Sequence, residues 1–117
     1  MEKKMRPLLL AALIAASSSQ ALAVPRATAP QDCVPINQIR ATRVVDDRNI
    51  DFEMTGGGVL RNRLPHACSG LGFERRFSYR TSLSRLCSLD IINVLDSNGH
   101  RGASCGLGRF VPVGPTR

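Results

Sequence analysis

Residues 50–54 read IDFEM, a strict alternation of apolar and acidic side chains. Side chains in a strand point to opposite faces in turn, so this alternation is typical of a strand with one buried face. It predicts that Ile50, Phe52 and Met54 face a core while Asp51 and Glu53 face water. This is the clearest strand signal in the chain, and it indicates a β fold.

Similar segments flank this strand on both sides. Residues 41–45 (ATRVV) precede it across a cluster of turn formers at 46–49, and residues 59–64 (VLRNRL) follow three glycines at 56–58. Turn formers and glycines between short apolar segments indicate tight reversals of the chain. The three segments therefore predict an antiparallel meander.

The C-terminal part of the chain predicts a hairpin. Residues 86–95 (LCSLDIINVL) are apolar enough for a strand that is buried on both faces, and Asn98-Gly99 is a strong signal for a two-residue turn. Residues 103–113 would form the return strand. One face of that strand would carry Cys105, Leu107, Val111 and Val113.

Residues 68–84 fit no single pattern. Phe73 and Phe77 are four positions apart, which suits a helical turn, whereas Phe77 and Tyr79 are two apart, which suits a strand. The pattern does not decide between a helix and a strand for this segment. The expected fold is mainly β, a small antiparallel meander or partly closed barrel held by two disulfides.

Length and composition restrict the possible classes of protein. The chain has 117 residues with a net charge of +7, and it is 43% hydrophobic but only 4% aromatic. This length allows one small domain. A multidomain enzyme, a transmembrane bundle and a collagenous or repeat protein are excluded.

The first 23 residues have the three parts of a secretory signal peptide. Lys3, Lys4 and Arg6 precede a short apolar run at 8–16, and the segment closes on Ala21-Leu22-Ala23. The apolar run is too short to span a bilayer. We expect cleavage before Val24, a flexible tether at 24–32 and a single domain at 33–117, located in the periplasm or secreted.

Removal of this leader would remove both lysines. All 13 remaining basic residues are arginines, and they face 8 acidic residues. Arginine keeps its charge at any pH and offers a planar fork that matches carboxylate and phosphate. A GC-rich genome, which encodes arginine readily, is the simpler explanation of this bias.

Four cysteines follow the leader, and an even number in a small exported domain predicts two disulfides. A two-residue turn at Asn98-Gly99 would place Cys105 opposite Ile92 and would set Cys87 five positions out of register with Cys105. That offset is about 16 Å, too far for a disulfide. Two connectivities then remain.

We expect the nested one, Cys33 with Cys105 and Cys68 with Cys87, because it would tie the two terminal strands together. The crossed alternative joins Cys33 to Cys87 and Cys68 to Cys105.

Catalytic signals are sparse. Asp51 and Glu53 share one strand face about 7 Å apart and could act as acid and base, although a solvated face paired with Arg43 or Arg61 explains them more simply. No serine lies in a nucleophile motif. His66 is without a neighbouring ligand at metal spacing, as is His100, so no metal or cofactor is expected.

The segment at 72–80 (GFERRFSYR) interleaves aromatic and basic residues. This composition occurs in single-strand nucleic-acid platforms, but the spacing does not match that pattern, and an exported protein meets little nucleic acid. Anionic lipid headgroups, lipopolysaccharide phosphates and acidic polysaccharides are better partners. A structural role with Phe73, Phe77 and Tyr79 in the core is the simpler interpretation. The candidate anion-binding residues are Arg61, Arg63, Arg75, Arg76 and Arg80.

One short motif occurs twice, as CSGLGF at 68–73 and CGLGRF at 105–110. Its glycines could present backbone amides to an anion, but without a strand, loop and helix context this signal is weak. Bends that bring each cysteine to its partner explain it better.

Several segments together resemble a family of small, uncharacterised exported proteins of Gram-negative bacteria. They are 45–50 (VDDRNI), 64–65 (LP) with Cys68, 77–81 (FSYRT), 86–90 (LCSLD) and 105–108 (CGLG). The resemblance covers nearly the whole exported part. It implies a periplasmic or secreted location and a disulfide β fold, and it supplies no catalytic residues.

We therefore expect a non-enzymatic envelope binding or structural protein with an arginine-rich surface. The alternative is a small hydrolase or lyase that uses Asp51 and Glu53. A deep pocket with both acids at its floor would favour the enzyme, and acids paired with arginines would favour the binding protein.

Overall fold

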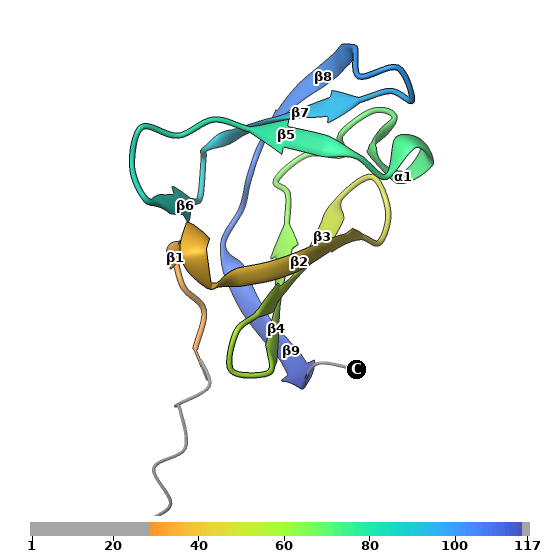
Figure 1. Cartoon of the computed structure of the whole chain (residues 1–117). Coiled ribbons are helices and arrows are strands. Elements are labelled where there is room, and N and C mark those ends of the chain that lie inside the picture. The colour runs from red at the N-terminus through yellow and green to blue at the C-terminus, as the bar shows by residue number, and fades with distance from the viewer. Residues whose placement is uncertain (1–28, 116–117) are drawn as a thin grey trace, which may run out of the picture.

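The alternating segment forms β3 (Asn49–Met54), an inner strand of a four-stranded antiparallel sheet (Figure 1). Its neighbours are β2 (Ile39–Val44) and β4 (Gly58–Arg63), and β9 (Phe110–Pro115) completes the order β2-β3-β4-β9. The predicted meander is confirmed. The computed structural model describes residues 29–115, so the predicted signal peptide lies outside the described residues.

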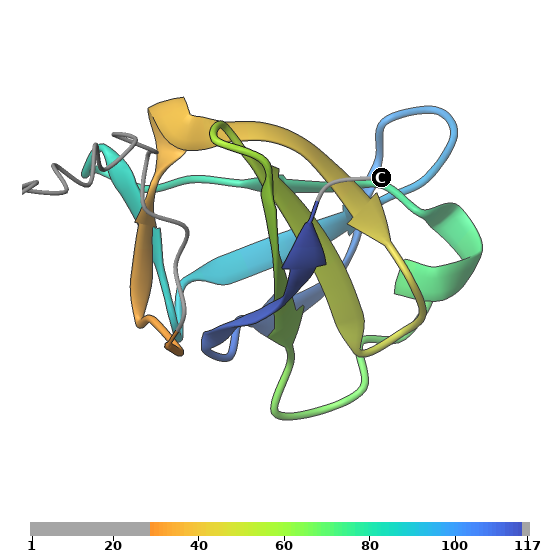
Figure 2. The ribbon, with the colours of Figure 1, turned by 90° about the horizontal axis from the view of Figure 1, so that it is seen from below.

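Two smaller antiparallel sheets complete the fold. One has the order β5-β7-β8 and consists of β5 (Phe77–Tyr79), β7 (Ile91–Leu95) and β8 (Arg101–Gly106). The other pairs β1 (Cys33–Pro35) with β6 (Arg85–Cys87). Short helical turns are η1 (Ile36–Gln38) and α1 (Leu71–Glu74). Figures 1 and 2 place β1 and β6 at one end of the molecule and α1 at the other.

The core lies between the four-stranded and three-stranded sheets. Phe52 and Phe110 are fully buried, and their rings meet edge to face with centroids 5.2 Å apart. Phe77 reaches the same cluster from the opposite sheet, 6.4 Å from Phe52. Ile50, Phe52 and Met54 are buried as the alternation predicted. The mainly β prediction is confirmed, with open sheets and no closed barrel in the described part of the chain.

The expected strand at 86–95 is two strands. β6 ends at Cys87 and β7 begins at Ile91, because Asp90 accepts the backbone N–H of Cys87 at 2.7 Å and closes a turn. Leu89 adopts a left-handed conformation with φ 74° inside this turn. The prediction of one continuous strand was wrong because Asp90 lies within an otherwise apolar segment and its carboxylate bonds the backbone.

The expected return strand at 103–113 is also broken. β8 and β9 belong to different sheets, and the chain between them approaches β4 so closely that a Cβ on Gly108 would collide with the carbonyl oxygen of Arg63. After the break, even-numbered residues face the core in place of odd-numbered ones. Phe110 faces the core, whereas Val111 and Val113 are exposed, contrary to the shared face predicted for them.

The hairpin between β7 and β8 has the predicted register but a different turn. Cys105 lies opposite Ile92 as expected. The loop, however, runs from Asp96 to His100, and of its central residues Gly99 has a positive φ while Asn98 does not. The register shifts by one residue near Gly102, a bulge that absorbs the longer loop.

The disulfides join Cys33 to Cys87 and Cys68 to Cys105. The nested pairing that we expected is wrong, and the crossed alternative forms. The reason is the two breaks described above: β6 separates from β7 and pairs with β1, so that Cys87 lies directly opposite Cys33. The exclusion of a bond between Cys87 and Cys105 holds.

The undecided segment contains both of its candidate structures in succession. Residues 71–74 form the single turn of α1, and residues 77–79 form β5. Phe77 and Tyr79 pack against the core, but Phe73 is 86% exposed, so the prediction of Phe73 as a core residue was wrong.

The end of the predicted tether is bound to the domain. Gln31 exchanges two backbone hydrogen bonds with Phe110, and the Asp32 carboxylate pairs with Arg109 at 3.0 Å. Within residues 29–115, no helix has the length and apolar character needed to cross a membrane.

Candidate functional site

The outer face of the four-stranded sheet carries a row of charges across three strands. Register places Arg43 of β2 opposite Asp51 of β3, and Asp51 opposite Arg61 of β4. Arg61 donates Nε–H and Nη2–H to the two carboxylate oxygens of Asp51 at 2.7 and 3.0 Å. This hydrogen bonding raises the pKa of Arg61. Asp51 is only 8% exposed, although the alternation predicted that it would face water.

Glu53 lies on the same face and has its own arginine. Its carboxylate accepts a hydrogen bond from Arg40 at 3.3 Å. Asp51 and Glu53 share a shallow hollow of about 420 Å³, whose other walls include Arg43, Val59 and Val113. The sequence therefore placed these two acids together correctly, but each of them is already in an ion pair.

The outer face of the three-stranded sheet has a different composition. Ser78, Asn93 and Ser104 lie opposite one another across β5, β7 and β8. Their neighbours along the strands, Phe77 and Ile92, pack into the core, so this row faces outward. Ser104 donates its hydroxyl to Asn93 Oδ1 at 2.7 Å.

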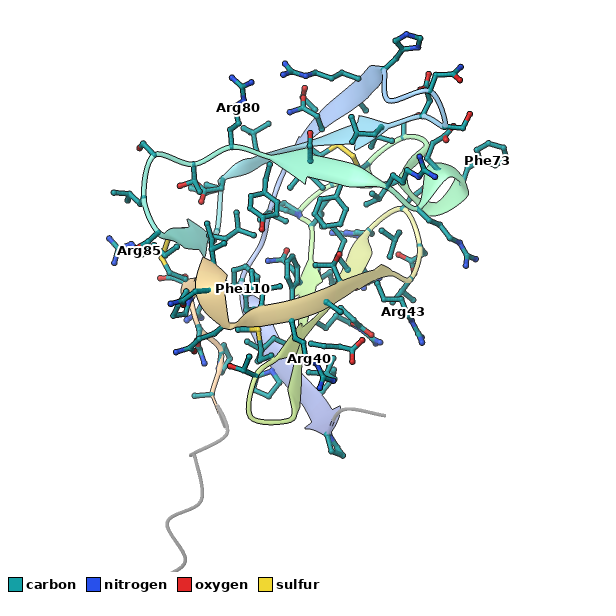
Figure 3. The ribbon with its side chains drawn as sticks, viewed as in Figure 1. Arg40, Arg43, Phe73, Arg80, Arg85 and Phe110 are labelled. Atoms are coloured by element: carbon teal, nitrogen blue, oxygen red, sulfur yellow. A yellow bond between two sulfur atoms is a disulfide. The ribbon has the colours of Figure 1, made fainter. Side chains whose placement is uncertain are left out.

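Arginines flank this polar row at both ends. Arg101 lies opposite Leu95, whose backbone N–H bonds the carbonyl oxygen of Arg76 on the other side, so Arg76 and Arg101 flank one position of β7. Arg80 follows β5 at the opposite end and points away from the core (Figure 3). The sequence interpretation included Arg76 and Arg80 but missed Arg101. The predicted hairpin register would have placed Gly102 opposite Leu95, and it is the bulge in β8 that brings Arg101 to this position.

The five predicted anion-binding arginines do not form one surface. Arg61 is paired with Asp51, and Arg63 lies at the end of β4 beside the turn at 45–49. Arg75 ends α1 in a left-handed conformation, and its Nε–H reaches the carbonyl oxygen of Gly72 at 3.4 Å. Arg61 and Arg63 lie on the outer face of the four-stranded sheet, whereas Arg76 and Arg80 lie on the outer face of the three-stranded sheet.

Most acids of the described chain serve the fold itself. Asp46 accepts the backbone N–H groups of Arg48 and Asn49, and the Arg48 bond holds the pKa of Asp46 below its ordinary value. Asp96 accepts the N–H groups of Asn98 and His100, and the His100 bond lowers the pKa of Asp96 in the same way.

Asp47 accepts the N–H of Gly72, and Asp90 accepts that of Cys87. Within residues 29–115, Glu74 is the acid whose side chain makes no hydrogen bond or ion pair. Six arginines, by contrast, have neither an ion pair nor a side-chain hydrogen bond in the described part of the chain: Arg43, Arg63, Arg76, Arg80, Arg85 and Arg101. The positive charge of the domain thus faces outward.

The repeated motif serves packing. Gly72 donates its N–H to Asp47 Oδ1 at 2.6 Å, and Gly108 donates its N–H to Asn62 Oδ1 at 2.8 Å. These amides are already bonded within the fold. The cysteines of the two copies, Cys68 and Cys105, are bonded to each other.

The histidines lie apart. His100 Nδ1 is 3.3 Å from Asp96 Oδ2 in the exposed hairpin loop, and His66 follows β4 on the surface. In the portion from residue 29 to residue 115, no group of three His, Cys, Asp or Glu side chains is arranged to hold a metal ion.

Comparison of the chain with protein-family models, with curated proteins and with solved structures finds no match to any of them. The structure therefore defines a small disulfide-bonded β domain with two outer sheet faces of different charge. Structural disulfides of this kind indicate an oxidising compartment.

Proposed function

We propose that this protein is an exported, non-enzymatic domain that binds anionic components of the cell envelope through its arginines. The observation that carries the proposal is the unequal use of charge. Among residues 29–115, every acid except Glu74 bonds to backbone amides or to Arg40, Arg61 or Arg109, while six guanidinium groups there have no partner. Charged guanidinium forks without internal partners favour carboxylate and phosphate ligands.

The pairing of the two candidate catalytic acids supports binding over acid–base catalysis. A general acid or base must exchange its proton with a substrate. Both oxygens of Asp51 already accept hydrogen bonds from Arg61, and Glu53 is held by Arg40. A hydrolase or lyase at this hollow would first have to break these ion pairs.

Export to the periplasm or the medium is part of the proposal. The leader at 1–23 supports it, as do the two disulfides and the resemblance to small exported proteins of Gram-negative bacteria. The periplasm and the medium are the places where a bacterial protein meets lipopolysaccharide phosphates and acidic polysaccharides at high density.

Retention on heparin tests the proposal. We expect the exported, disulfide-bonded chain to bind a heparin column at about 50 mM salt and to elute as salt rises, because screening and counterion release weaken such contacts. A column of the same matrix without heparin is the control. Passage through the heparin column at about 50 mM salt, together with failure to bind phosphatidylglycerol vesicles, would overturn the proposal.

A further inference from the structure

We infer that the outer face of the three-stranded sheet is the binding surface and that its ligand is an anionic saccharide. This surface, called the arginine face below, consists of Arg76, Arg80 and Arg101 around the row of Ser78, Asn93 and Ser104. The inference rests on the proposed function and gives it a location and a ligand class.

Strand geometry brings these six side chains onto one face. Ser78, Asn93 and Ser104 are in register, so neighbouring members of the row lie about 5 Å apart. Arg76 and Arg101 flank Leu95, two positions along β7 from Asn93, which is about 7 Å away. Arg80 lies two positions beyond Ser78 at the other end. A flat polar row thus has positive charge on both sides.

The charge of the arginine face is not balanced locally. Glu74 of α1 lies two residues before Arg76 and makes no ion pair with it. The two acids that flank β7 in the sequence are Asp90, which bonds the N–H of Cys87, and Asp96, which bonds the N–H groups of Asn98 and His100. Both lie in the turns that bound the strand. The other outer face differs, because Asp51 and Glu53 lie among its arginines. An anion therefore meets repulsion from carboxylates on that face and little on the arginine face.

The polar row favours a saccharide over a simple polyanion. The side-chain oxygen of Asn93 accepts a hydrogen bond from Ser104. The amide N–H groups of Asn93 make no hydrogen bond within the described chain. Amide N–H groups donate to sugar hydroxyls, and serine hydroxyls both donate to them and accept from them, whereas an ionised phosphate chain offers only acceptor oxygens. Phe73, the most exposed aromatic residue of the described part, lies on α1 and not on this face.

The test compares two charge-removing variants by their affinity for a heparin fragment, with the exported full domain and its disulfides intact. Arg76→Ala with Arg101→Ala removes two arginines from the arginine face. Arg43→Ala with Arg63→Ala removes the same charge from the other sheet and is the matched control. We expect at least a tenfold loss for the first pair and about a two- to threefold loss for the second, which reports only the lower net charge.

A second comparison tests the saccharide assignment. Asn93→Ala should weaken binding of the heparin fragment several-fold and binding of linear polyphosphate much less, since phosphate oxygens accept from the Asn93 amide but have no hydroxyl that donates to the oxygens of the row. All these side chains are at the surface, and urea unfolding will show that each variant is folded.

The outcomes separate the two proposals. If the wild-type domain binds heparin but both arginine pairs lose affinity equally, the arginine face is wrong and the proposed function stands. If Asn93→Ala affects heparin and polyphosphate alike, or neither, the saccharide assignment is wrong. If the wild type ignores heparin yet binds phosphatidylglycerol vesicles through Phe73, this inference falls and a lipid surface is the partner. If it binds neither probe, the proposed function itself falls.

Discussion

The contact between Asn62 and Gly108 shows at residue scale how this small domain is joined. Asn62 is fully buried, donates Nδ2–H to the carbonyl oxygen of Gly108 at 2.7 Å, and accepts its N–H at 2.8 Å. The amide side chain thus takes the place of a strand neighbour for Gly108. A buried amide is tolerated only when such partners are present, so this pair fixes where the chain passes between β8 and β9.

Gly108→Ala should therefore destabilise the domain strongly. A Cβ at Gly108 would collide with the backbone carbonyl of Arg63, which cannot move without disturbing β4. We expect the free energy of unfolding in urea to fall by about 2 kcal/mol, the usual effect of overpacking against a rigid neighbour.

Gly106→Ala is the matched control, because nothing lies within 4 Å of a Cβ at that position. It should change the free energy of unfolding by less than about 0.5 kcal/mol. Equal effects of the two substitutions would show that the close approach at Gly108 is not what requires glycine.

At the scale of elements, short turns decide where strands end. The turn at 46–49 joins β2 to β3 through the carboxylate of Asp46, and the turn at 88–90 separates β6 from β7 through Asp90. Each aspartate bonds backbone N–H groups that would otherwise be left without a partner. The first turn was evident from four consecutive polar residues, whereas the second lay within an apolar run and was missed.

Asp46→Ala should lower stability in a pH-dependent way. The pKa of Asp46 is lowered in the fold, so its ionised form stabilises the domain above the unfolded pKa of about 3.9, and this contribution is lost as the pH falls through the folded pKa. At pH 6 we expect urea unfolding of the variant to show a loss of roughly 0.5–1 kcal/mol, small because the turn is exposed.

The difference between the variant and the wild type should shrink as the pH is lowered to about 2.5. Glu74→Ala, which removes one carboxylate that makes no hydrogen bond or ion pair among residues 29–115, is the control for the loss of a single charge. A constant difference between Asp46→Ala and the wild type over this pH range would contradict the role assigned to the carboxylate.

At the scale of the whole molecule, the two sheets enclose one core and present two unlike outer faces. One face has arginines paired with Asp51 and Glu53, and the other has arginines around an uncharged polar row. The two disulfides lie in different parts of the fold: one joins β1 to β6, and the other joins the loop after β4 to β8. A domain of this size gains from such links because its buried surface is small.

We expect the chain to be processed during export. The positively charged start, short apolar run and Ala-Leu-Ala end predict removal of residues 1–23 during export. Mass spectrometry of the intact exported protein should give the mass of a chain that begins at Val24 and contains two disulfides. Detection of the same protein with Met1 retained in the exported fraction would contradict the prediction.

The features that depend on neighbouring residues could be predicted from the amino-acid sequence. These are the β class, the meander of β2, β3 and β4, the buried face of β3, and the opposition of Ile92 and Cys105. Alternation and turn chemistry act over a few residues, so they can be read directly along the chain. The juxtaposition of Asp51 with Glu53 follows from the same alternation.

Contacts between distant segments could not be predicted in this way and are known from the three-dimensional structure. The pairing of β1 with β6 selects the crossed disulfides, and the approach of Gly108 to β4 sends β9 to a different sheet from β8. It likewise placed Arg101 with Arg76 and left Phe73 at the surface. These outcomes depend on which long-range packing has the lowest free energy, and a local pattern of apolar and polar residues does not encode that choice.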